Sequence, residues 1–253
     1  MLFDSHAHYN DSRFLEDVDE ILLSMQGNNV SYIMNACSSI DEIPYFLELA
    51  EKYDFLYASV GVHPHDVENM TDKDIEILAN YAKHPKVKAI GEIGLDYYYD
   101  NSPRDLQKKW FACQIELAQR LDMPIIIHDR DAHRDCLDIL NQYRGVKGVF
   151  HCYSGSAEML SEVLDLVLYV AFGGSVTFKK SQRPVEAAKA APLDKILIET
   201  DCPYLTPEPF RGKRNSSLYV HLVAEKLAEI KNISISEIEK VTLENAKKCF
   251  MID

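Results

Sequence analysis

The amino-acid sequence predicts an α/β protein with the (β/α)8 barrel fold, the TIM barrel, on three observations. The chain has 253 residues, close to the roughly 250 that such a barrel typically contains. Short apolar runs alternate with helix-like segments, and we count eight of these runs. Strands that alternate with helices pair in parallel through right-handed crossovers, so eight such units indicate a closed barrel. A doubly wound open sheet is the main alternative.

The strands are expected where apolar runs are bounded by turn residues or by charged helical sequence. No linker, repeat or low-complexity segment interrupts the alternation, so we expect a single domain over residues 1–253, with C-terminal helices in 216–253 packing on the barrel. The expected strands are residues 2–5, 30–36, 55–61, 87–91, 124–127, 147–150, 168–172 and 195–198.

Capping residues mark the start of several helices between these strands. Ser102 is placed to cap a helix that has Pro103 at its first position. Thr71 and Ser156 are similar candidates, and Ser234 begins a capping box before the last helix.

Composition and charge limit the kinds of partner. The formal net charge is −13, so the chain has no general attraction to nucleic acid or to anionic membranes. A phosphate substrate then needs a local positive site, which a pair of divalent metal ions would provide. The six cysteines form no CxxC pair, which favours reduced thiols in a cytoplasmic protein. No signal peptide or spanning apolar run is recognisable, and we expect no membrane association and no obligate protein partner.

Histidines and carboxylates follow nearly every apolar run. In a (β/α)8 barrel the carboxyl ends of all strands meet at one face, and that face carries catalysis. Residues far apart in the sequence are therefore expected to converge there. They are His6, His8, His63, His65, Glu92, Asp96, His128, His151, Glu199 and Asp201.

These residue types suit divalent metal ions. His6 and His8 lie two residues apart, so both side chains point to one side of a strand and can hold one ion. Imidazole and carboxylate ligands fit zinc or manganese, whereas magnesium prefers more oxygen. Glu92 is best placed to bridge two ions that activate a shared water. We expect two divalent ions (Mg, Mn or Zn) held by His6, His8, Glu92, His128, His151 and Asp201.

The other polar residues at this face have competing interpretations. His63 is favoured as a contact to the substrate or leaving group, whereas His65 and Asp96 are expected to be ordinary loop residues. Glu199 either supports a ligand or fills a barrel layer. Cys152, Cys202 and at least some of the tyrosines after the strand ends (Tyr97, Tyr98, Tyr153 and Tyr204) are expected to be packing residues, although aromatic rings also stack on nucleobases.

Two basic loops suggest a phosphate substrate. They are Lys179–Arg183 after the seventh run and residues 211–214 after the eighth, where this fold often binds phosphate. Arg211 and Arg214 are the expected substrate-binding residues, because guanidinium groups contact phosphate through two hydrogen bonds. The alternative is that both loops are merely solvated.

The motifs together resemble the TatD family of metal-dependent deoxyribonucleases. The matching stretches are FDSHAHYND, GVHPHD, GEIGLDYYYD, IIIHDRDA, HCYSG, FGGSVTFK, IETDCPYLTP and RGKRN, in the order of the family, over residues 3–215. The resemblance implies a TIM-barrel hydrolase related to the amidohydrolases, the same six metal ligands with Glu92 bridging, and 3′ to 5′ exonuclease action on single-stranded DNA. Ser216 and Ser217 replace the proline-containing turn often found after RGKRN, and Gly174 is also a departure.

The sequence therefore predicts a hydrolase in which activated water attacks a phosphodiester of single-stranded DNA or a similar substrate. Glu92, Asp201 and His63 are the expected catalytic residues: Asp201 accepts the proton of the water, and His63 with Arg211 or Arg214 holds the phosphate. Two alternatives stay open. One is a metallohydrolase of the same scaffold that cleaves an ester, lactone or amide bond, and the other is a barrel that only binds.

Overall fold

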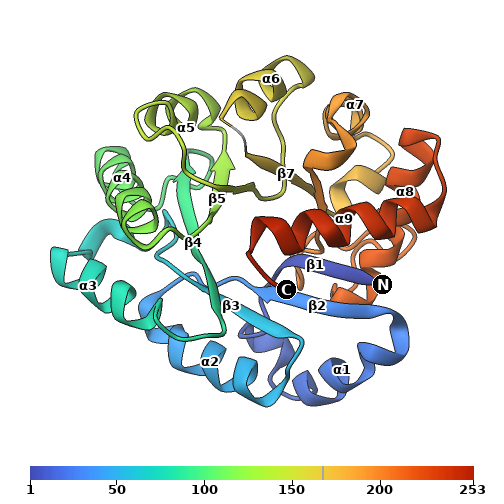
Figure 1. Ribbon diagram of the computed structural model, residues 1–253, viewed down its shortest axis with the longest axis horizontal. Helices are drawn as coiled ribbons and strands as arrows, with labels where there is room; N and C mark the ends of the chain where they lie inside the picture. The colour runs from blue at the N-terminus through green and yellow to red at the C-terminus, as the bar shows by residue number, and fades with distance from the viewer. Residues whose placement is uncertain (167) are drawn as a thin grey trace.

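Eight parallel strands form one sheet in which each strand pairs with the next along the chain (Figure 1). The computed structural model describes residues 1–166 and 168–253. The (β/α)8 barrel predicted from the sequence is confirmed. The strands are β1 (Leu2–Ala7), β2 (Val30–Asn35), β3 (Leu56–Val60), β4 (Val87–Asp96), β5 (Ile125–Arg130), β6 (Gly148–Phe150), β7 (Tyr169–Phe172) and β8 (Ile196–Ile198).

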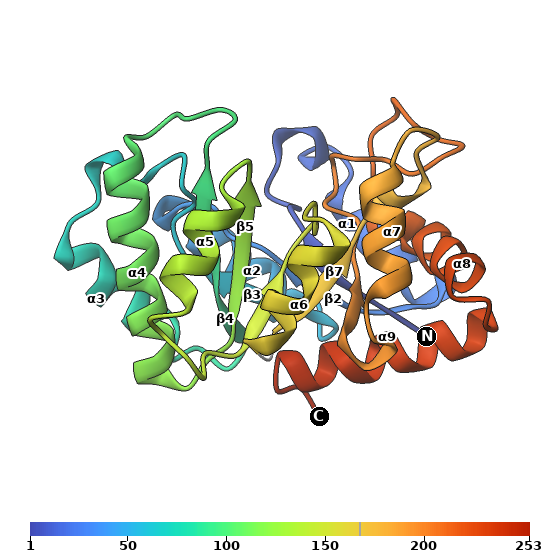
Figure 2. The same ribbon diagram turned by 90° about the horizontal axis from the view of Figure 1, so that it is seen from above.

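The helices surround these strands (Figure 1). Seen from the side, long loops rise at one end of the barrel, and a helix lies across the other end (Figure 2). In the part of the chain that the structure describes, no helix is long and apolar enough to cross a membrane. The α-helices are α1 (Val18–Ser24), α2 (Ile43–Lys52), α3 (Asp72–Tyr81), α4 (Arg104–Leu121), α5 (His133–Leu140), α6 (Ala157–Asp165), α7 (Gln182–Ala190), α8 (Val220–Lys231) and α9 (Ile235–Cys249).

The first and last strands meet through a short contact that closes the barrel. Ala7 forms a parallel bridge with Cys202, and the backbone N–H of Asp201 donates to His6 O at 2.9 Å. Below this bridge, the buried carboxylate of Asp4 accepts hydrogen bonds from the backbone N–H and the hydroxyl of Thr200, at 2.8 and 2.6 Å. The ends of β1 and β8 are thus fixed side by side.

Strands β4 and β5 run farther than the sequence suggested. Their predicted ends were residues 91 and 127, but pairing continues until Asp96 lies opposite Arg130. Gly94 permits this continuation, because it has a φ of 148° and a Cβ there would lie 1.9 Å from His128 O. Only glycine adopts this conformation at such close range without steric cost.

The predicted caps are confirmed at three helices and wrong at one. The hydroxyl of Ser156 accepts a backbone hydrogen bond from Met159, Ser234 caps α9 in the same way, and Thr71 heads a capping box. Ser102 does not cap α4. Pro103 has an extended ψ of 133° and is itself the N-cap, and the hydroxyl of Ser102 donates instead to His65 O at 2.8 Å. The start of α4 is therefore tied to the loop after β3.

Helix α9 covers the amino-terminal end of the barrel (Figure 2). Buried apolar side chains of its last turn and those just after it join a separate apolar cluster with inward-facing residues of the strands, such as Phe3 and Met34. The fully buried ring of Phe250 lies 5.7 Å from the ring of Phe3. This end of the barrel is consequently a packed core, so we expect a reaction site at the opposite end.

Removal of the Phe250 ring should destabilise the fold. We expect Phe250→Ala to lower the free energy of unfolding by about 3–5 kcal/mol, because the substitution leaves a cavity among buried side chains. The neighbouring Met251 is 46% exposed, so Met251→Ala should change the free energy of unfolding by less than about 0.5 kcal/mol. Urea denaturation followed by circular dichroism measures both variants. Equal stability of the two would show that α9 does not support the barrel.

Candidate active site

A cavity of about 780 Å³ opens at the carboxyl end of the strands. Most of the residues that line it lie at the ends of strands or in the loops that follow them. Asp201 reaches it from the turn after β8 with a φ of 57°, a left-handed conformation that aspartate adopts more readily than most residues. The polar lining includes His8, His63, His65, Glu92, Asp96, His128, Arg130, His151 and Asp201.

Three side chains converge on one side of the Glu92 carboxylate. Glu92 Oε2 lies 3.3 Å from His6 Nε2 and 3.7 Å from His8 Nε2. Asp201 Oδ1 lies 3.4 Å from His8 Nε2 and 3.9 Å from His6 Nε2. Strands β1 and β4 and the turn after β8 therefore contribute nitrogen and oxygen atoms to one small volume.

The other oxygen of Glu92 faces a second group of imidazoles. Glu92 Oε1 lies 2.8 Å from His128 Nδ1, 3.2 Å from His151 Nε2 and 3.7 Å from His63 Nε2. The carboxylate is 3% exposed, so both of its oxygens are enclosed by side chains. One carboxylate therefore separates two clusters of ligand-type atoms.

The donor atoms of the first cluster fit a cation. His6 Nε2 and His8 Nε2 face each other at 3.0 Å, and the buried Nδ1 of His6 has no hydrogen-bond partner among the described residues. Two imidazoles that share one volume with two carboxylates match the ligands that divalent metals prefer. The structure thus brings together all six residues that the sequence suggested as ligands, and their chemistry fits a divalent cation.

The charges of this site depend on one another. Burial alone would raise the pKa of Glu92, but the neighbouring His151 and His6 and a hydrogen bond from His128 hold the pKa well below its usual value. Burial alone would lower the pKa of His151, but the carboxylates of Glu199 and Glu92 raise the pKa well above its usual value. In the metal-free protein, therefore, an ionised Glu92 is balanced by protonated histidine.

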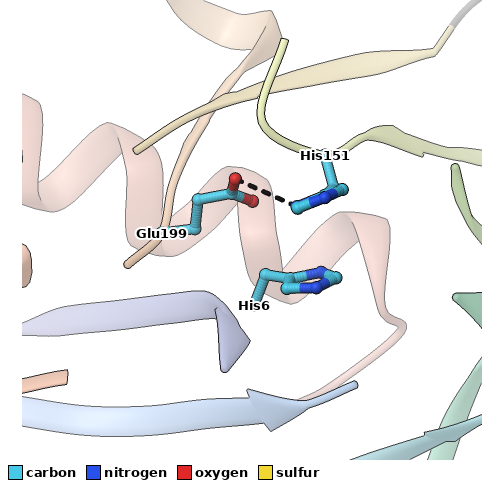
Figure 3. A group of neighbouring side chains, drawn as sticks. All are labelled: His6, His151 and Glu199. Carbon is cyan, nitrogen blue, oxygen red and sulfur yellow. Dashed lines mark hydrogen bonds and ion pairs between the residues drawn. The ribbon is translucent and has the colours of Figure 1, made fainter. Parts of the chain in front are cut away.

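Glu199 supports His151 from behind (Figure 3). Its Oε1 lies 3.2 Å from His151 Nδ1 and accepts the backbone N–H of Cys152 at 2.7 Å. The ring of His6 stacks on the ring of His151, with centroids 3.8 Å apart. Of the two interpretations of Glu199, support of a neighbouring side chain agrees with these contacts. The orientation of His151 is fixed from two directions.

Asp96 belongs to the site, so its interpretation as an ordinary loop carboxylate was wrong. Its fully buried side chain places Oδ2 2.9 Å from His65 Nε2 and 3.1 Å from His128 Nε2. Oδ1 accepts the backbone N–H groups of Tyr98 and Tyr99 at 3.0 and 2.8 Å. The available signal was the four-residue spacing from Glu92, which puts both carboxylates on one face if the strand continues. His65 also lines the cavity.

The two arginines expected to bind substrate do not join the other residues. The guanidinium of Arg214 pairs with Asp17 at 2.5 Å, and that of Arg211 lies 4.2 Å from the ring centroid of Phe178. Neither residue lines the cavity, whereas His63 and Arg130 do.

The cysteines beside the ligands are buried or half-buried, in agreement with a packing role. Burial raises the pKa of the Cys202 thiol to about 12, so this group is not a thiolate nucleophile near neutral pH. Among the tyrosines, Tyr153 is buried and donates its hydroxyl to Ser156 O. Tyr98 and Tyr204 are 60% and 48% exposed.

Comparisons with known proteins agree with this geometry. A family model described as TatD related DNase matches residues 3–251. The chain is 46% identical over 255 residues to YabD of Bacillus subtilis strain 168, an uncharacterized metal-dependent hydrolase, with 100% of both chains covered. It is 36% identical over 258 residues to YcfH of Escherichia coli K12, which carries the same description, covering 100% of this chain and 96% of the relative.

A solved structure also shows similarity to the TatD family. The crystal structure of YJJV, a TATD homolog from Escherichia coli K12, superposes with a TM-score of 0.94 at 28% identity, covering 100% of this chain and 98% of the other. The match of the family model therefore extends from the sequence to the arrangement of the strands. The chain belongs to the TatD related DNase family of metal-dependent hydrolases.

Proposed function

We propose that this protein is a two-metal hydrolase that cleaves phosphodiester bonds of single-stranded DNA, removing nucleotides from the 3′ end. The observation that carries the proposal is the position of Glu92, whose two oxygens face two separate clusters of ligand atoms. A carboxylate in this position is suited to bridge two cations. The family description supports DNA as the substrate class.

The residues divide into two candidate sites. His6, His8 and Asp201 with one oxygen of Glu92 would hold one divalent cation, and His128 and His151 with the other oxygen would hold the second. Zinc, manganese or magnesium are the candidate ions. When bound, two such cations lower the pKa of a water and stabilise negative charge on the attacking and leaving oxygens.

Asp201 is the proposed acceptor of the proton that the attacking water loses. Burial alone would raise the pKa of Asp201, but a hydrogen bond from His8 and the charge of His151 lower it, so the carboxylate is ionised and able to accept a proton. It lines the cavity beside Glu92, which is the position that a general base requires.

His63 is the proposed hydrogen-bond donor to the phosphate. Burial and the nearby His128 hold the pKa of His63 well below its usual value, so its ring is neutral. Its Nδ1 accepts the backbone N–H of His65 at 3.2 Å. A neutral imidazole has one N–H, which must then be on Nε2, the nitrogen that faces Glu92 Oε1 at 3.7 Å. An oxygen of the substrate in the cavity can accept this N–H.

The substrate class is tested by direct comparison. The metal-free protein, supplied with manganese, zinc or magnesium, should release nucleotides from single-stranded DNA labelled at its 5′ end, and a chelator should abolish the reaction. Product ladders on a denaturing gel show the direction of degradation. An ester and lactone panel is the control. Turnover of an ester, lactone or amide without release of nucleotides would overturn the phosphodiester assignment, and metal-independent activity would overturn the mechanism.

The role of Glu92 predicts a graded series of losses. Removal of a residue that only orients a ligand typically costs 10–100-fold in activity, so Glu199→Gln should fall in about that range and Glu92→Gln should lose more than about 100-fold in kcat/KM. Glu76, 68% exposed on α3, provides a control that should keep full activity. Circular dichroism shows whether each variant is folded. Full activity of folded Glu92→Gln would mean that the reaction takes place elsewhere.

Metal uptake should become stronger as the pH rises. A cation binds only deprotonated imidazole, and the pKa of His151 in the metal-free protein is raised by Glu199 and Glu92. The protonated form therefore dominates below this raised pKa, and zinc must displace a proton there. Calorimetry between about pH 6 and 8, in buffers with different ionisation enthalpies, measures both the affinity and the protons released. Affinity that is independent of pH, with no proton release, would contradict the assignment of His151.

A further inference from the structure

Arg130 is an unusual side chain in the cavity proposed to bind the substrate. The lining contains six carboxylates, and Arg130 is the one arginine or lysine among the described residues that line it. Besides the histidines and the proposed cations, this guanidinium is therefore the cationic group that a phosphodiester meets in the described lining. The carboxylates are Asp11, Glu42, Asp66, Glu92, Asp96 and Asp201.

Strand β5 positions Arg130 directly beyond the metal ligands. Arg130 is two residues after His128, so both side chains project from the same side of the strand. Two residues advance a parallel strand by about 6.6 Å. Pairing with β4 continues to this point, where Arg130 lies opposite Asp96 and its carbonyl accepts the backbone N–H of Tyr97 at 2.9 Å. The backbone of Arg130 is therefore part of the barrel rather than of a loose loop.

Two tyrosine rings hold the guanidinium in place. The Arg130 Cζ atom lies 4.2 Å from the ring centroid of Tyr98 and 4.7 Å from that of Tyr99. The rings are 60% and 54% exposed and meet edge to face at 87°. The turn that carries them is anchored by Asp96, which also contacts His128. The guanidinium therefore has a defined position relative to the metal ligands.

Arg130 has no carboxylate within ion-pair distance among the described residues, which distinguishes it from a nearby arginine. Arg104 lies over Tyr97 in a similar stack, at 4.1 Å, but pairs with Asp100 at 3.0 Å. A stacked guanidinium keeps the N–H groups on its edge, and these match the oxygens of a phosphate in a bidentate arrangement. The edge of Arg130 is available for an external anion.

We propose that Arg130, held by Tyr98 and Tyr99, binds the phosphate of the nucleotide next to the one being removed. This inference rests on the proposed function and adds a specificity to it: the enzyme prefers a strand with at least two phosphates over a substrate with only the scissile one. Arg130 makes no contact to the reacting atoms in this arrangement. It contributes to the affinity for the substrate and not to the chemical step.

Two thymidine oligonucleotides separate these contributions. The dinucleotide TpT has only the scissile phosphate, whereas the trinucleotide TpTpT has a second one. With the manganese-loaded enzyme, Arg130→Gln should raise KM for TpTpT about tenfold or more, leave kcat within twofold, and leave KM for TpT within twofold. Arg104→Gln is the matched control and should not change either substrate. An equal loss on both substrates, or no loss on either, overturns the proposal.

Binding to the metal-free protein tests the same contact without catalysis. Fluorescence anisotropy with a labelled oligothymidine in a chelator should show weaker binding by Arg130→Gln and a salt slope that is smaller by about 0.7, the value for one phosphate contact on a single strand. Arg130→Lys should restore the slope and only part of the affinity, because lysine keeps the charge but not the bidentate geometry. Arg104→Gln should match the wild type.

The two assays distinguish failure of this inference from failure of the proposed function. If the wild type hydrolyses neither oligonucleotide, the phosphodiesterase function is wrong, and the anisotropy measurement still decides the role of Arg130. If wild type and Arg130→Gln bind the oligothymidine equally, including no binding by either, the phosphate contact is wrong whatever the enzyme cleaves. Arg130 is exposed, so circular dichroism of the variant should match the wild type.

Discussion

The arrangement of this site depends on one buried carboxylate among imidazoles. A carboxylate that leaves water must be matched by positive charge and hydrogen bonds, or its burial destabilises the fold. Glu92 is enclosed, and the side chains around its two oxygens come from strands β1 and β5, from the turn after β6 and from the loop after β3. The imidazoles that offset the cost of burying Glu92 are also the donor groups that a cation needs. Supporting contacts from Glu199 and Asp96 then fix the orientations of His151 and His128.

Much of this could be predicted from the sequence, because the barrel converts a linear pattern into a spatial one. Histidines and carboxylates that follow apolar runs must converge once the strands are parallel. The fold and the six ligand-type residues could therefore both be predicted from the sequence. The places of Asp96 and Arg130 in the site could not be predicted, because they depend on where β4 and β5 end. Gly94 allows the pairing to continue through a close backbone approach that local pattern alone does not reveal. At Ser102, the extended conformation of Pro103 shifted the start of α4 by one residue.

The basic loops illustrate a second limit of sequence patterns. Arg214 follows the last strand and was predicted to bind phosphate, but it forms an ion pair with Asp17, which is distant in the sequence. Arg211 lies over the ring of Phe178. Whether a surface cation faces a cavity or a neighbouring carboxylate is decided by contacts between distant segments, which spacing does not encode. Arg130 shows the reverse case, in which a regular strand directs the side chain and its orientation follows from that of His128.

The closure between β1 and β8 has a consequence for how the protein is made. The ribosome synthesises His6 and His8 well before Asp201, which lies beside them through the backbone hydrogen bond to His6 O. A nascent chain thus exposes imidazoles long before their carboxylate partner exists. The complete set of proposed ligands arises only once the last strand has docked against the first, so we expect metal loading at the end of folding rather than at its beginning.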